Sequence, residues 1–191
     1  MGLLDFGKSN KDKKQDSFIK NTNWYDKGSS LVKLEKYEEA IACYNQLIRL
    51  DPQDVKAWSN KGFALTNLEK YEEAIACYNQ VIRFNSKDHN AWFNRGNSLA
   101  NLGKYEESIA CYDRVISLDS ENLGALFNKG NSLANLGKYE ESIACYDRVI
   151  KINPKKVSAW RYKGMVLKKL GEDEEAEKCF LKSKELGFVT K

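Results

Sequence analysis

The sequence has little proline, a single histidine and no long apolar run. Of its 191 residues, 2 are Pro and 1 is His, and the formal net charge is only +4. So little proline leaves helices uninterrupted, and a hydrophobic content of 42% can supply a helical core without a disulfide or a metal. No apolar stretch is long enough to cross a membrane, and the one near the start of the sequence is too short for a secretory signal. We therefore expect a soluble, mostly helical protein of the cytoplasm.

Sequence motifs of catalysis are also missing. His89 is the only histidine, and there is no GxSxG nucleophile motif and no Gly-rich phosphate-binding loop. Lys and Arg are interspersed with Glu rather than gathered in a stripe, which disfavours a nucleic-acid-binding surface. We expect no enzymatic activity, no cofactor and no nucleic-acid partner.

The sequence contains one segment twice. Residues 93–116 and 127–150 differ only by Arg95 in the first and Lys129 in the second, and they start 34 residues apart. The same period relates a glycine and a cysteine throughout the chain: Gly28, Gly62, Gly96, Gly130 and Gly164, and Cys43, Cys77, Cys111, Cys145 and Cys179. Such a period is typical of stacked-repeat proteins. We divide the chain into a polar arm at 1–20 and five repeats at 21–54, 55–88, 89–122, 123–156 and 157–190.

Three other places of the repeat are filled alike in every copy. A large apolar residue stands in the fourth place, and a small residue precedes an aromatic one by four: Trp24, Trp58, Trp92, Leu126 and Trp160; Ala40, Ala74, Ser108, Ser142 and Ala176; Tyr44, Tyr78, Tyr112, Tyr146 and Phe180. Over about nine tenths of the chain this pattern resembles the tetratricopeptide repeat (TPR). The resemblance implies an all-α fold of five helix-turn-helix units, a right-handed superhelical α-solenoid with a concave groove for protein–protein recognition.

Each repeat is predicted to form two helices, as the third repeat illustrates. The first helix is expected from about Asn90 to Leu102, with Gly103 in the left-handed conformation that often ends a helix. The second helix starts near Lys104, and acidic residues in its first turn, such as Glu106, favour the helix dipole.

The five cysteines occupy one place of successive repeats. Neighbouring helices in such a stack are ~8–10 Å apart. A disulfide needs Cα atoms within about 7 Å, and zinc ligands converge more closely still. We interpret the cysteines as reduced, partly buried apolar residues and expect no metal site.

One face of the first helices is rich in asparagine. At about 100° per residue, Trp92, Gly96 and Leu99 form a buried stripe, and Asn94 and Asn97 lie opposite. Because Asn is a worse helix former than Ala by about half a kcal/mol, a row of asparagines indicates a function. A carboxamide can both donate to and accept from a peptide backbone. We predict a peptide-binding groove lined by Asn60, Phe63, Asn67, Phe93, Asn94, Asn97, Asn101, Phe127, Asn128, Asn131, Asn135 and Arg161.

The TPR resemblance has two consequences for this groove. Asn60, Asn94 and Asn128 occupy the sixth place, where asparagines in the TPR superhelix of O-linked N-acetylglucosamine transferase hold peptide backbone. The carboxylate clamp of chaperone-binding TPR domains is matched only at Asn97 and Asn128, which are similar to its two asparagines. Its cationic places hold Phe93, Ser158 and Tyr162, the last of them next to Arg161. The resemblance therefore implies backbone recognition rather than capture of a C-terminal carboxylate.

Other interpretations stay open. The asparagines of the third and fourth repeats can be a by-product of duplication. The chain can also be a self-assembling structural module or an assembly factor, a homo-oligomer that uses its ends or convex face, or, with less support, a nucleic-acid-binding helical repeat. In the last helix Glu177 and Lys184 replace the isoleucines of the other repeats, as expected of a solvent-facing cap. The sequence does not indicate whether Leu3, Leu4 and Phe6 of the arm dock in the groove.

Overall fold

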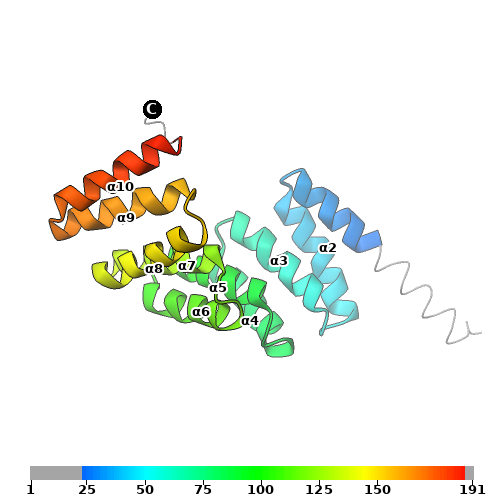
Figure 1. Cartoon of the computed structure of the whole chain (residues 1–191). Coiled ribbons are helices and arrows are strands. Elements are labelled where there is room, and N and C mark those ends of the chain that lie inside the picture. The colour runs from blue at the N-terminus through cyan, green and yellow to red at the C-terminus, as the bar shows by residue number, and fades with distance from the viewer. Residues whose placement is uncertain (1–22, 188–191) are drawn as a thin grey trace, which may run out of the picture. The chain divides into compact units, whose positions relative to one another are not determined.

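The computed structural model describes residues 23–187, and every regular element in that range is an α-helix (Figure 1). The all-α prediction is confirmed. The predicted arm at 1–20 and the end of the fifth repeat, 188–190, lie outside these residues. No helix of the described range is long and apolar enough to span a bilayer.

The helices form two compact units. The N-terminal unit, which ends at Asn85, contains a helix at residues 23–33, α2 (Tyr37–Leu50), α3 (Val55–Asn67) and α4 (Tyr71–Phe84). The C-terminal unit, which starts at Ser86, contains α5 (His89–Asn101), α6 (Tyr105–Leu118), α7 (Leu123–Asn135), α8 (Tyr139–Ile152), α9 (Val157–Leu170) and α10 (Asp173–Glu185). Within each unit every helix packs against the next one in the chain, as α9 and α10 show in orange and red in Figure 1.

An aromatic ring beneath a glycine forms the centre of each repeat, a tyrosine in the first four repeats and Phe180 in the fifth. Tyr112 and Tyr146 are almost fully buried, and a Cβ added to Gly96 or Gly130 would lie only 2.8 Å from the Cε1 atom of the ring. The small residue four positions before the tyrosine, such as Ser142, is buried as well. These places are repeated along the sequence because the two helices approach too closely there for larger side chains.

The tryptophan of the fourth place does more than fill the core. Gly96 and Leu99 of the predicted stripe are buried, but Trp92 is only half-buried, and its Nε1–H donates to the carbonyl of Ser86 at 3.0 Å. Trp160 makes the corresponding bond to Pro154 at 2.8 Å. The indole therefore ties the first helix of a repeat to the loop before it.

The turn inside each repeat needs a left-handed residue. Gly103, Gly137 and Gly171 have φ angles of 74°, 75° and 81°, as predicted for the third repeat. The first two repeats have Glu35 and Glu69 in this place, with φ angles of 58° and 57°. A residue with a Cβ is strained in this conformation by about 1–2 kcal/mol. The first two turns are therefore less favourable than the glycine turns.

The helix starts follow two patterns. At the start of α3, α5 and α7, the side chains of Asp54, Asp88 and Asn122 each accept the N–H of the residue three positions later, at 2.8–3.0 Å. The N-cap of α9 is Lys156, which makes no side-chain cap. The second helices carry acidic residues in their first turns, as predicted.

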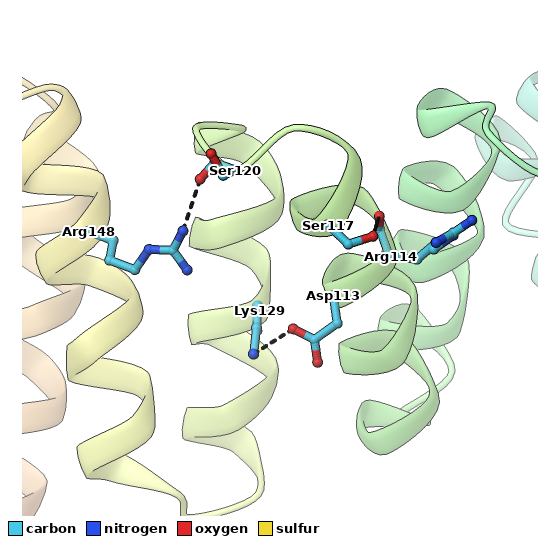
Figure 2. A network of polar contacts seen from close by, with 6 residues as sticks. All are labelled: Asp113, Arg114, Ser117, Ser120, Lys129 and Arg148. Carbon is cyan, nitrogen blue, oxygen red and sulfur yellow. Dashed lines mark hydrogen bonds and ion pairs between the residues drawn. The ribbon is translucent and has the colours of Figure 1, made fainter.

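Polar contacts also join the third repeat to the fourth (Figure 2). Nζ of Lys129 lies 2.6 Å from Oδ1 of Asp113, and Arg148 donates to the carbonyl of Ser120 at 2.9 Å. Such exposed ion pairs contribute about 0–1 kcal/mol each. They engage Lys129 within the protein, and the corresponding Lys163 is engaged in the same way.

All five cysteines are buried and have no disulfide partner within the described residues. Burial raises the pKa of the Cys77 thiol to about 11, so the thiol stays protonated at neutral pH. A group of three or more His, Cys, Asp or Glu side chains that could hold a metal ion does not occur among residues 23–187.

Candidate functional site

The predicted asparagines of α5 differ in their contacts. Oδ1 of Asn97 accepts two hydrogen bonds, from the hydroxyl of Tyr112 at 2.9 Å and from Nδ2 of Asn128 at 2.8 Å. Nδ2 of Asn101 donates to the carbonyl of Asn97, one turn earlier, at 3.0 Å. Asn94 is half-buried, and its side chain has no hydrogen bond to any residue between 23 and 187. Of these three side chains, only that of Asn94 makes no hydrogen bond within the described residues.

Helix α7 repeats this arrangement. Oδ1 of Asn131 accepts the hydroxyl of Tyr146 at 2.7 Å, and Nδ2 of Asn135 donates to the carbonyl of Asn131 at 2.9 Å. Burial raises the pKa of Tyr146 to about 12, so its hydroxyl remains a donor at neutral pH. Asn128 donates to Asn97, and its amide oxygen accepts nothing from the described residues. The sixth-place asparagines, Asn94 and Asn128, thus keep free hydrogen-bonding groups.

The predicted phenylalanines of this unit pack against tyrosines. The rings of Phe93 and Tyr112 have centroids 6.0 Å apart. Phe127 lies 5.7 Å from Tyr146 and 5.2 Å from Tyr162, the latter in an edge-on arrangement. The cluster is larger in the fourth repeat because Tyr162 of α9 replaces an asparagine.

A pocket of about 460 Å³ opens between α7 and α9, next to this cluster. It is lined by Asn131, Ala134 and Asn135 of α7, Tyr139 and Tyr146 of α8, and Tyr162, Met165, Val166 and Lys169 of α9. Met165 is 47% exposed, so part of the apolar lining faces solvent. An apolar pocket with a few polar groups is the usual form of a binding site.

The remaining predicted residues lie elsewhere. Arg161 lines a second hollow, of about 450 Å³, together with Lys155, Lys156 and Ser158 at the start of α9. Asn60, Phe63 and Asn67 lie on α3 of the N-terminal unit. Phe63 is 48% exposed, Nδ2 of Asn67 donates to the Phe63 carbonyl at 2.8 Å, and the Asn60 side chain has no hydrogen bond within the described range.

Sequence comparison identifies the repeats. A family model described as Tetratricopeptide repeat matches residues 55–88, 89–122 and 124–156. The chain belongs to the tetratricopeptide repeat family. A model described as TPR repeat matches residues 28–68, and a second Tetratricopeptide repeat model matches residues 145–178. Membership of this family supports a role as a protein–protein interaction scaffold.

Solved TPR structures share the fold. MamA 41-end from Desulfovibrio magneticus RS-1 has a TM-score of 0.84 at 18% identity, over 87% of this chain and 94% of that one. Another crystal structure of MamA has a TM-score of 0.80 at 21% identity, over 83% and 93%. YrrB, described as a TPR protein with an unusual peptide-binding site, has a TM-score of 0.77 at 19% identity, over 94% and 93%. At these identities the likeness shows the fold alone. No curated protein matches the chain.

Several pocket residues were not predicted from the sequence. Tyr162, Met165 and Lys169 of the fifth TPR line the pocket, as does Tyr139 of the fourth. The first three occupy places that hold asparagine in the fourth repeat. The signal for these three is that the fifth repeat departs from the fourth at those places, whereas Tyr139 has the same residue in the first four repeats and carries no such signal.

Proposed function

We propose that this TPR protein is a non-catalytic scaffold that binds an extended peptide segment of a partner protein along α5, α7 and α9. An apolar side chain of the segment occupies the pocket between α7 and α9, and Asn94 and Asn128 bond to its backbone. The observation that carries the proposal is the partly exposed apolar pocket, which is of a size to accept one large side chain.

The hydrogen bonds of the asparagines support this assignment. The side chain of Asn94 makes no hydrogen bond within residues 23–187, and the amide oxygen of Asn128 accepts none there, so both can bond to a peptide backbone. YrrB, which has the same fold, is described as having a peptide-binding site. A peptide site on this fold is therefore physically feasible.

Selection from a random peptide display library tests the proposal without knowledge of the partner. We expect enrichment of peptides that share an apolar residue. Met165→Asp should weaken the binding of these peptides by roughly tenfold to a hundredfold, because burial of an apolar side chain contributes about 1.5–3 kcal/mol. Leu181→Asp is the matched control, since Leu181 is equally exposed, at 50%, but does not line the pocket.

The asparagines are tested with the same peptides. Asn94→Ala/Asn128→Ala should weaken binding by roughly tenfold to a hundredfold, since each hydrogen bond contributes about 0.5–1.5 kcal/mol. Asn101→Ala is the comparison, because the amide nitrogen of Asn101 already donates to the Asn97 carbonyl within α5 and Asn101 is not a sixth-place residue; it should weaken binding less than the double change. Failure to enrich any peptide, or equal binding by the Met165→Asp protein, would contradict the proposed function.

A further inference from the structure

Positive charge is concentrated in one segment beside the pocket. Residues 151–170, from the end of α8 through α9, contain seven basic residues and no Asp or Glu: Lys151, Lys155, Lys156, Arg161, Lys163, Lys168 and Lys169. The whole chain has 31 Lys and Arg against 27 Asp and Glu, so without this segment it would be net negative. The interspersed charge pattern of the other repeats ends here.

These charges lie on both sides of the apolar pocket. Tyr162, near the middle of α9, lines the pocket and also the second hollow. Lys169, in the last turn of α9, lines the pocket, whereas Lys155 and Lys156, which precede α9, line the hollow. A ligand that covers Tyr162 along α9 therefore meets cations in both directions.

The lysines that line the pocket and the hollow are available for a ligand. They differ in this from Lys163 of the same segment, which forms an ion pair with Asp147 at 2.6 Å. Lys155, Lys156 and Lys169 are exposed, and none of them forms an ion pair with an acidic residue of the described range. Unpaired cations near one another repel, and an anionic ligand relieves that repulsion.

Helix stability explains Lys169 but not Lys156. A cation in the last turn of a helix interacts favourably with the helix dipole, whereas a cation at the N-cap opposes it. Asp54, Asp88 and Asn122 cap the corresponding helices of other repeats, and Lys156 gives up that stabilisation. Lysine is also the N-cap of α2, α4, α6 and α8, so Lys156 departs only from the pattern of the first helices, α3, α5 and α7.

We propose that the partner segment is acidic, with Asp or Glu on both sides of the apolar residue that fills the pocket. One carboxylate lies near Lys169, and another lies near Lys155 and Lys156. This inference rests on the proposed function and adds the charge of the ligand to it.

A nucleic acid fits the same surface less well. Helix α10 follows α9 with four consecutive acidic residues, Glu172 to Glu175. A phosphate backbone carries a charge at every nucleotide and would be repelled by this run, whereas a peptide can place a few charges where the lysines are. An acidic peptide is therefore the favoured ligand.

Fluorescence anisotropy with two synthetic peptides tests the proposal. The first is labelled Ser-Glu-Ser-Glu-Phe-Glu-Ser-Glu-Ser, and the second has Gln in place of every Glu. At about 50 mM NaCl the Glu peptide should bind roughly tenfold more tightly than the Gln peptide. At about 500 mM NaCl the difference should become small, because salt screens exposed charges.

Single charge changes locate the effect. Lys169→Glu should weaken binding of the Glu peptide by roughly threefold to tenfold. Lys168→Glu is the matched control, because Lys168 is in the same turn of α9 but lines neither hollow. Lys156→Asp should weaken binding and also raise the thermal unfolding temperature, since it restores an N-cap. If Lys156 had only a structural role, its replacement would not lower the affinity for the peptide while raising the thermal unfolding temperature.

Three outcomes would overturn the inference: equal affinity for the Glu and Gln peptides, equal effects of Lys168→Glu and Lys169→Glu, or tighter binding of a labelled ten-nucleotide poly-U RNA than of the Glu peptide. If both peptides bind equally and Met165→Asp abolishes both, the acidic preference is wrong and the proposed function stands. If neither peptide binds and the display library enriches nothing, both are wrong.

Discussion

Replacing Asn97 by Ala should destabilise the C-terminal unit, whereas the same change at Asn94, one turn earlier in α5, should not. Asn97 accepts hydrogen bonds from Tyr112 and Asn128, at 2.9 Å and 2.8 Å. Asn94 has no side-chain partner in the described part of the chain. The two substitutions are chemically identical, so any difference between them reports the tertiary contacts of Asn97.

The expected magnitudes follow from these contacts. Two hydrogen bonds contribute about 1–3 kcal/mol together, and Ala recovers about half a kcal/mol of helix propensity. The free energy of unfolding should therefore fall by about 0.5–2.5 kcal/mol for Asn97→Ala. We expect a value in the upper half of this range, because Tyr112 is only 1% exposed and its hydroxyl loses its acceptor. Asn94→Ala should raise it by about half a kcal/mol.

Urea unfolding followed by far-ultraviolet circular dichroism measures both variants. A double-mutant cycle adds specificity, because Asn97→Ala/Tyr112→Phe removes donor and acceptor together and should cost less than the sum of the single changes. Asn101→Ala, which removes only a bond within α5, serves as the control. If Asn97→Ala stabilises the protein as much as Asn94→Ala does, the assigned contacts do not hold the repeat together.

Three further predictions concern the turns, the buried tyrosines and the last helix. Glu69→Gly should raise the free energy of unfolding in urea by about 1 kcal/mol, and Gly103→Glu should lower it by a similar amount. A Cβ at Gly103 would meet nothing within 4 Å, so the strain of the left-handed backbone is the only cost of the second change. A loss of stability in Glu69→Gly would contradict this. Burial raises the pKa of Tyr78 from 10.0 to about 12. The protonated hydroxyl therefore contributes its full share to the free energy of unfolding below pH 10, and this share is lost as the pH rises to 12. The urea midpoint should fall over that range, and it should fall less steeply in Tyr78→Phe. Glu177→Ile with Lys184→Ile should expose an apolar face on α10 and promote association, and an unchanged mass in light scattering would argue against a capping role.

The sequence by itself determined the repeats and their helix pairs. These features depend on residues close in the chain and repeated every 34 positions, so a single helix-turn-helix pattern predicted the helix pairs and, in the third repeat, the glycine turn. Gly103 illustrates this, since its left-handed turn was expected from its place after a helix and is present in the structure. The left-handed turns at Glu35 and Glu69 were not predicted, because no glycine marks them. The bounds of α5 differ from the predicted ones by only a residue because both are set by local capping.

Only the tertiary structure decided which asparagines are available and where the pocket lies. Asn94 and Asn97 look alike in the sequence, but the partners of Asn97 are 15 and 31 residues away and lie on two other helices. The pocket is likewise assembled from α7, α8 and α9. A hydrogen bond or a cavity between helices depends on how closely their side chains approach in space, and the helical period fixes only the face on which each residue lies.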